Sequence, residues 1–232
     1  MLTPSSNTAL EPITAAMLAE VAALHVARFR VTEITLSQTG LAQFDDVPML
    51  HASSLLADAR VAAIGWNGTS GGWLGFDVDR RLCAGIGAAT GIPATTSMLA
   101  LNDILAARGV RRLGLVTPYT DDVQARIVAN YAVLGIETIS ERHIGISENF
   151  AFAEVRPETI AAMVREVAAA RPEAIAIICT NLRAAPLVAA LEAETGILVL
   201  DTIATVVWGA LRLAGVDPAA ISSWGRLFRE GR

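Results

Sequence analysis

The chain has 232 residues, is 53% hydrophobic and carries a formal net charge of −5. This acidic balance, with no cluster of basic residues, argues against nucleic acid as a partner. No apolar run approaches the ~20 residues of a membrane-spanning helix, and no signal-peptide pattern opens the sequence. We therefore expect a cytoplasmic protein without a membrane partner.

All 18 basic residues are arginine. Without lysine, the chain can form neither a Schiff base with pyridoxal phosphate nor a Walker A phosphate site. The three histidines, at positions 25, 51 and 143, show no metal-ligand spacing. The two cysteines are expected to be free thiols. We expect an enzyme without a metal or other cofactor.

Hydrophobic periodicity predicts alternating strands and helices along the whole chain. In the first half, the expected strands are residues 1–3, 31–36, 61–66 and 93–95, and the expected helices are residues 10–28, 50–59, 78–89 and 97–108. In the second half, the expected strands are residues 112–116, 137–142, 173–179 and 197–200, and the expected helices are residues 122–134, 157–170, 184–195 and 202–214.

Short motifs recur between the two halves. Thr-Gly-Ile occurs at 90–92 and 195–197, and Thr-Pro occurs at 3–4 and 117–118. Ordered matches of this kind predict an α/β protein with two pseudo-symmetric lobes, each a parallel sheet flanked by helices, and an active site in the cleft between them. We expect one lobe at residues 1–108, with the helix at 202–214 packing back on it, and the other at 109–232. A single doubly wound sheet is the alternative.

A buried strand is expected to end at Cys179. The preceding residues form an unbroken apolar run, and Thr180 and Asn181 follow directly. In open α/β sheets the ligand crevice lies at the carboxyl ends of the strands. A helix expected soon afterwards would lower the pKa of the thiol through its N-terminus. Cys179 is thus predicted to be a reactive acid or base, although a buried cysteine can also be a plain core residue. Cys83 lies on an apolar helical face and is predicted to belong to the core.

Small hydroxyl, amide and glycine residues follow the other strands too. Such groups suit a small carboxylate ligand without a fixed positive charge. The candidates are Asn7, Gly68, Thr69, Ser70, Tyr119, Asn149, Thr180 and Asn181. Each has a simpler interpretation: residues 5–8 could cap a helix, residues 68–72 could form a tight turn, and Tyr119 could pack at a helix start. Arg183 could supply a positive charge or lie in solvent.

Taken together, these motifs resemble the aspartate/glutamate racemase superfamily, in the branch of maleate cis-trans isomerases and arylmalonate decarboxylases. The resemblance runs from residue 3 to about residue 215. It implies two lobes around one active site, no cofactor and often a homo-oligomer. Cys179 would deliver a proton to carbon, and Tyr119 would act beside it. Gly68, Thr69 and Ser70 would stabilise an enediolate, and Asn7 and Asn149 would hold carboxylates, with Thr180 and Asn181 also at the substrate.

One position departs from that pattern. Many members carry a second cysteine in the first lobe, and here its place is taken by Gly68 or Asn67. Two-base racemisation needs a thiol on each face of the carbanion, and maleate isomerisation needs the first-lobe thiolate as a nucleophile. One thiol favours forming an enediolate and protonating it on one face, as a decarboxylase does, whereas Asn7 and Asn149 resemble the isomerases.

We therefore predict a cofactor-independent isomerase, racemase or decarboxylase of this superfamily, acting on a small carboxylic or dicarboxylic acid. Two alternatives remain. The chain could be a non-catalytic binding protein for small acids. It could also be a relative of proteins associated with ectoine or hydroxyectoine utilisation, which its Cys-Thr-Asn-Leu-Arg motif at 179–183 resembles.

Overall fold

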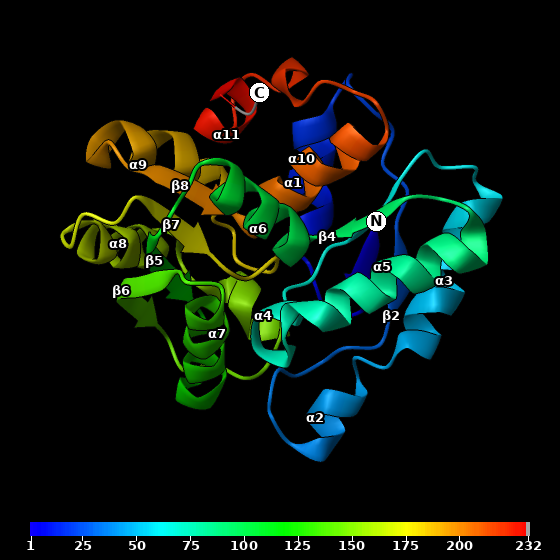
Figure 1. Cartoon of the computed structure of the whole chain (residues 1–232), viewed down its shortest axis with the longest axis horizontal. Coiled ribbons are helices and arrows are strands. Elements are labelled where there is room, and N and C mark those ends of the chain that lie inside the picture. The colour runs from blue at the N-terminus through cyan, green and yellow to red at the C-terminus, as the bar shows by residue number, and fades with distance from the viewer. Residues whose placement is uncertain (231–232) are drawn as a thin grey trace.

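A computed structural model describes residues 1–230. The chain forms two four-stranded sheets, and every strand pair is parallel. In spatial order, the first sheet contains β2 (Ala27–Phe29), β1 (Leu2–Pro4), β3 (Ile64–Trp66) and β4 (Ala94–Thr96). The second contains β6 (Glu137–His143), β5 (Arg112–Thr117), β7 (Ala174–Ile177) and β8 (Leu198–Asp201). The sheets lie in separate lobes (Figure 1).

Helices flank both sheets (Figure 1). The first half of the chain contributes α1 (Leu10–Leu18), α2 (Gln38–Ala42), α3 (Asp46–Asp58), α4 (Gly71–Leu74), α5 (Phe76–Thr90) and α6 (Ser97–Ala107). The second half contributes α7 (Asp121–Val133), α8 (Pro157–Ala168), α9 (Val188–Thr195), α10 (Thr202–Leu213) and α11 (Arg226–Glu230). Three short 3₁₀ helices are η1 (Phe150–Glu154), η2 (Ala185–Leu187) and η3 (Pro218–Ala220).

The predicted two-lobe architecture is confirmed, and both sheets follow the same strand pattern. The recurring Thr-Gly-Ile motifs end equivalent helices: Gly91 and Gly196 both adopt left-handed conformations, with φ of 71° and 73°. In each motif the threonine hydroxyl donates back to a helix carbonyl and accepts from the isoleucine N–H two residues on. Repeated local geometry of this kind places each following strand, β4 or β8, at the same point of its sheet.

Helix α10 belongs to the second half of the chain, yet it packs against α6, β3 and β4 of the first lobe. Nine of its twelve residues are buried. Asp201 caps its N-terminus by accepting from the N–H groups of Ile203 and Ala204. The helix thus joins the two lobes, while the boundary at residues 108 and 109 stays a prediction.

Two predicted elements at the start of the chain are wrong. The helix expected at residues 10–28 ends at Leu18, because the chain turns at Ala19 (φ 35°) and returns to pair β2 with β1. The strand expected at 31–36 lies outside the first sheet. Within residues 1–230 it forms one bridge, an antiparallel one between Glu33 and Glu148 of the other lobe. In both segments, contacts with distant parts of the chain have overridden the local preference that the sequence pattern indicates.

Residues 30–45, between β2 and α3, form a segment that we call the cover. It lies across the junction of the lobes and contains α2. The Ile34 N–H donates to Ser147 at 2.8 Å, and the Asn149 N–H donates to Thr32 at 3.0 Å. These bonds tie the cover to the loop after β6.

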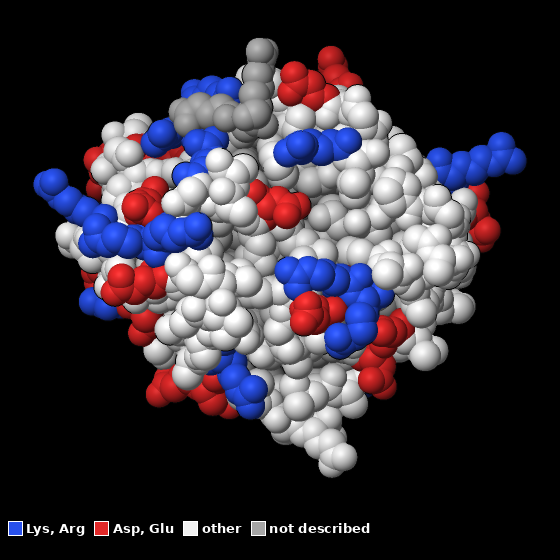
Figure 2. Space-filling model, in the orientation of Figure 1, with Lys and Arg blue, Asp and Glu red and all other residues white. Residues whose placement is uncertain are grey.

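Charged residues of both signs are mixed over the face seen in Figure 2, without a broad patch of one sign. No helix of residues 1–230 has the length and apolar character needed to cross a membrane.

Candidate active site

Loops from both lobes enclose a small cavity at the carboxyl ends of the strands. It is lined by Pro4, Val31, Ile34, Phe44, Trp66, Gly68, Thr69, Trp73, Tyr119, Asn149, Cys179 and Thr180. The volume that the centre of a water molecule can occupy in this cavity is about 20 Å³. That is room for about one water molecule. No Asp, Glu or Arg is among the described lining residues. The site therefore offers neutral hydrogen-bonding groups within an apolar wall.

Cys179 lies two residues beyond β7 and is buried. Its sulfur accepts a hydrogen bond from the Asn181 backbone N–H at 3.3 Å, and its own N–H donates to Thr202 Oγ1 at 3.1 Å. Burial raises the pKa of the thiol to about 12, against the opposing effect of hydrogen bonds from Asn181 and Tyr119. The thiol is therefore protonated at neutral pH, which suits a proton donor rather than a nucleophile.

The prediction that a helix lowers the pKa of Cys179 is wrong. The expected helix at 184–195 begins as η2, and α9 itself starts only at Val188. The thiol consequently sits beyond the reach of that helix's first turn, where the dipole acts. Desolvation dominates instead and shifts the pKa upward.

Tyr119 follows β5 and brings a phenol to the same cavity. Its hydroxyl lies 2.6 Å from Thr69 Oγ1 of the other lobe and is also hydrogen bonded to Cys179. Burial raises the pKa of Tyr119 well above its usual value. The phenol therefore stays neutral and available as a hydrogen-bond donor. A ring contact with Trp73, with centroids 5.2 Å apart, helps to hold its ring in place.

Six of the predicted site residues line the cavity, and three do not. The six are Gly68, Thr69, Tyr119, Asn149, Cys179 and Thr180. Ser70 precedes α4, and its Oγ accepts from Trp66 Nε1 at 3.4 Å. Asn7 and Asn181 are buried behind the lining and have protein partners.

Asn7 and Asn181 connect the lobes. Asn7 Nδ2 donates to the Thr180 carbonyl at 3.1 Å, while its Oδ1 accepts from the N–H groups of Ala9 and Leu10 at the start of α1. Asn181 extends from the second lobe to the first, where its Oδ1 accepts from the N–H groups of Thr8 and Ala9. The helix-cap interpretation of residues 5–8 thus describes the contacts that Asn7 makes.

Asn149 extends the hydrogen bonds that Asn7 and Asn181 make between the lobes. Its Nδ2 donates to Ser6 Oγ at 2.7 Å, and its carbonyl accepts from Asn181 Nδ2 at 2.5 Å. Ser6 Oγ in turn donates to the Val31 carbonyl of the cover at 2.6 Å. The candidate site and its cover are therefore linked by one set of hydrogen bonds.

Two other predicted candidates lie away from the cavity. Arg183 is exposed, and its Nε donates to the Ala153 carbonyl at 3.2 Å. Cys83 lies half-buried on α5, where burial and the nearby Asp79 raise its pKa to about 12. Cys179 is therefore the one cysteine of this chain at the cavity.

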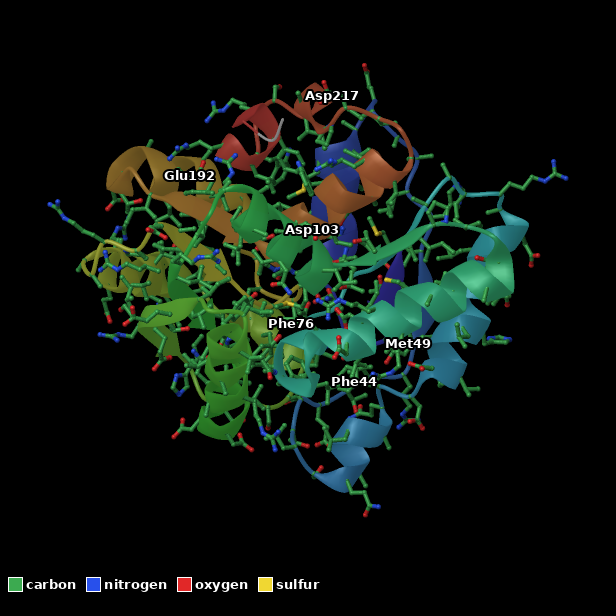
Figure 3. All side chains as sticks on the ribbon, in the orientation of Figure 1. Phe44, Met49, Phe76, Asp103, Glu192 and Asp217 are labelled. Atoms are coloured by element: carbon green, nitrogen blue, oxygen red, sulfur yellow. The ribbon has the colours of Figure 1, made fainter. Side chains whose placement is uncertain are left out.

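Sequence reasoning missed the apolar wall of the cavity. Phe44 comes from the cover and meets the Trp73 ring edge-on, with centroids 5.7 Å apart, beside α4 (Figure 3). Trp66 ends β3 and faces Gly68. An indication for Trp73 was its place in the glycine-rich stretch after β3. Phe44 had no local signal, because only the closure of the cover brings it to the site.

The comparisons with known proteins agree with this architecture. The family model described as arylmalonate decarboxylase matches residues 6–228. This chain belongs to that family of enzymes. It is 34% identical over 144 residues to arylmalonate decarboxylase from Bordetella bronchiseptica, covering 61% of this chain and 60% of that protein. It is 29% identical over 132 residues to maleate isomerase from Nocardia farcinica, covering 56% and 52%. The sequence matches thus span little more than half of each relative.

Solved structures resemble the fold over almost its whole length. A mutant of Nocardia farcinica maleate cis-trans isomerase with a covalently bound succinylcysteine intermediate superposes with a TM-score of 0.89, at 24% identity, covering 99% of this chain and 96% of that one. A double mutant of arylmalonate decarboxylase in its liganded form gives 0.87 at 25% identity, covering 99% and 97%. The predicted resemblance and fold class are confirmed.

Proposed function

We propose that this protein is a cofactor-independent enzyme that protonates an enediolate formed from a small carboxylic or dicarboxylic acid, with Cys179 as the proton donor. The proposal rests chiefly on one observation. A single protonated thiol contacts a neutral tyrosine hydroxyl, which is bonded to Thr69, at a small cavity whose described lining residues include no Asp, Glu or Arg. Its relatives named for decarboxylation and isomerisation of such acids support the same class of substrate.

Decarboxylation is the reaction that this arrangement supports best. A carboxylate held against the apolar wall of this site lacks part of the solvation that stabilises it in water, which favours loss of carbon dioxide. The electron pair of the broken C–C bond enters the remaining carboxylate as an enediolate. Hydrogen bonds from Thr69, Tyr119 and nearby backbone N–H groups then stabilise the new negative charge. Cys179 gives its proton to carbon, and the thiolate is reprotonated from water.

Substrate can enter only if the cavity enlarges. The cover carries three lining residues, Val31, Ile34 and Phe44. It is held by two backbone hydrogen bonds to the second lobe and by one from Ser6 of the first lobe, and it is not a strand of either sheet. We assign Asn7 and Asn181 to positioning the two lobes, and Asn149 and Thr180 to contacting the substrate at the edge of the cavity. The predicted cytoplasmic location and homo-oligomer stay predictions.

The test is proton exchange at carbon. The protein is incubated in deuterium oxide with small mono- and dicarboxylic acids, including maleate and an arylmalonate, and the products are followed by NMR. We expect release of carbon dioxide with one deuteron placed at carbon. Cys179→Ser should abolish this reaction, and Cys83→Ser, which changes the cysteine outside the cavity, should leave it intact. Conversion of maleate to its trans isomer would favour the isomerase reaction instead. Binding without exchange or reaction would contradict catalysis.

A further inference from the structure

A groove between α5, α6 and α10 lies apart from the Cys179 cavity. The volume that the centre of a water molecule can occupy in it is about 600 Å³, which is enough for a small organic ligand. None of its described lining residues also lines the Cys179 cavity. Asp103 belongs to this lining and lies near the middle of the face in Figure 3, where side chains of both charges occur (Figure 2). The groove is thus a separate candidate for ligand binding.

Charged groups of opposite sign line this groove. Arg80 of α5 and Arg212 of α10 both act electrostatically on Asp103 of α6, where they oppose the rise that burial causes in the pKa of this carboxyl. Within residues 1–230, Asp103 forms an ion pair with neither arginine. Arg80 pairs instead with Asp77, and the Arg212 guanidinium lies 4.6 Å from the centre of the Trp208 ring. One carboxylate and two guanidinium groups therefore border the same groove without contacting each other.

Two buried polar side chains of the same lining have no hydrogen-bond partners. Trp208 is 5% exposed, and its Nε1–H finds no acceptor within residues 1–230. Both amide atoms of Asn102, Nδ2 and Oδ1, are also buried and without a partner in that part of the chain. Native structures rarely leave such groups unpaired, because each has lost its hydration without a replacement. The groove therefore has two donors and one acceptor available for a ligand.

We propose that this groove binds an α-amino acid with an apolar side chain, in its zwitterionic form. The carboxylate is bound by Arg80, Arg212 and the Trp208 N–H, because all three donate hydrogen bonds and two are positively charged. The ammonium group is bound by the Asp103 carboxylate and Asn102 Oδ1, which accept. The inference goes beyond the proposed function, since it concerns a separate site and needs no chemistry at Cys179.

The charges and the apolar lining together select this class of ligand. A simple carboxylate would be repelled by Asp103, and a simple amine would be repelled by the two arginines. Leu99 of α6 and Leu213 of α10 add apolar surface, and Gly209 leaves space beside them. Because α10 also packs against the first lobe, a ligand held between α6 and α10 should stabilise the folded chain.

Calorimetric titration of the whole protein tests the ligand class. L-Leucine is compared with 4-methylpentanoate, which lacks the ammonium group, and with 3-methylbutylamine, which lacks the carboxylate. L-Leucine should bind saturably, at least about tenfold more tightly than either analogue, and should raise Tm. Glycine, which has both charges but no side chain, should bind more weakly than L-leucine.

Variants test the assigned contacts. Asp103→Asn should weaken L-leucine binding about tenfold or more without weakening 4-methylpentanoate binding, whereas Arg212→Gln should weaken both. Arg80→Gln and Arg81→Gln form a matched pair, because Arg81 is exposed on the same helix and is not among the lining residues. Only Arg80→Gln should reduce affinity. Thermal unfolding without ligand checks that each variant is folded.

Several results would overturn the proposal. They are the absence of saturable L-leucine binding, equal binding of 4-methylpentanoate or glycine, and unchanged affinity in a folded Asp103→Asn variant. Cys179→Ser distinguishes the two sites and should bind L-leucine as the wild type does. Loss of binding in that variant would place the amino acid in the Cys179 cavity instead. The proposed function fails separately, if the wild type shows no Cys179-dependent reaction with any acid.

Discussion

The ends of β3 and β7 occupy the same place in two similar sheets, yet one is followed by a reactive side chain and the other is not. After β7 the chain presents a buried thiol with its backbone and tyrosine partners. After β3 it presents a glycine against an indole. The lesson is that a symmetric fold fixes where chemical groups can meet, whereas the side chains at those positions decide which groups the cavity offers.

The lobes also reach across to one another in similar ways. Tyr119, after β5, is bonded to Thr69 in the first lobe. Asn7, after β1, donates to Thr180 in the second lobe. One pair contains a phenol that faces the cavity, and the other contains an amide whose hydrogen bonds are made within the protein. The first pair is suited to chemistry and the second to holding the lobes together.

The largest expected effect concerns a buried carboxyl of the first lobe. Burial raises the pKa of Asp79 to about 7, although a hydrogen bond from Thr96 opposes the shift. The folded chain therefore binds more protons than the unfolded chain between about pH 4 and pH 7, and Asp79 lowers stability as the pH rises through that range. The loss is about 4 kcal/mol. Asp79→Asn should remove this part of the pH dependence in urea unfolding.

Asp77→Asn is the matched control for that experiment, because the Asp77 side chain is 80% exposed and pairs with Arg80 at the surface. Its unfolding curves should follow those of the wild type at every pH. Parallel curves for Asp79→Asn and wild type would contradict the assignment.

Removal of an amide between the lobes should come next. Asn181→Ala removes the acceptor of the Thr8 N–H and a donor to the Asn149 carbonyl, while the Ala9 N–H keeps its bond to Asn7 Oδ1. We expect a loss of about 3 kcal/mol in the free energy of unfolding. Asn102→Ala is the control, because no hydrogen-bond partner for the Asn102 amide is found among residues 1–230. Equal losses for both variants would show that Asn181 does not join the lobes.

Loss of the hydroxyl that joins Thr69 and Cys179 should affect catalysis more than folding. Tyr119→Phe keeps the ring contacts and removes one donor to the enediolate, so kcat should fall about 10²-fold. Tyr131→Phe is the matched control. Tyr131 is equally buried, packs on Phe76, and its hydroxyl has no partner within the described chain. If both variants keep full activity in the deuterium assay, Tyr119 is not part of the catalytic site.

The smallest expected effect tests the symmetry itself. Gly91→Ala and Gly196→Ala each place a side chain in a left-handed conformation, with open space around the new Cβ. Backbone strain alone should then cost about 1 kcal/mol at each position. Because the two helix ends have the same geometry, the two losses measured by chemical denaturation should agree. A much larger loss at one position would show that the lobes are not equivalent there.

Much of the secondary structure was predictable because its signals are local. Helices α5, α6, α7 and α10 lie within about two residues of their predicted bounds. The short α2, α4 and α11 were not predicted. The strand β2 was also missed, since three residues within an apolar stretch carry too little periodicity to mark a strand.

The candidate site was predictable to a similar degree. Strand ends indicated Cys179, Tyr119 and the loop at Gly68 and Thr69, and these residues do line one cavity. The pKa of the thiol was predicted in the wrong direction, because sequence alone cannot show how deeply a group is buried. Residues 31–36 of the cover were predicted to be a strand, because the residues that they actually bond to lie more than 100 positions away in the chain.

The sequence by itself determined the order of the α/β units, the glycine-ended helices that repeat between the lobes, and a thiol at the end of a buried strand. Each of these follows from local periodicity and backbone preference. Only the tertiary structure decided that Tyr119 meets Thr69, that Asn7 and Asn181 hold the lobes together, and that the Trp66 indole lies against Gly68. Those features depend on close packing of side chains from separate loops, which no pattern of neighbouring residues encodes.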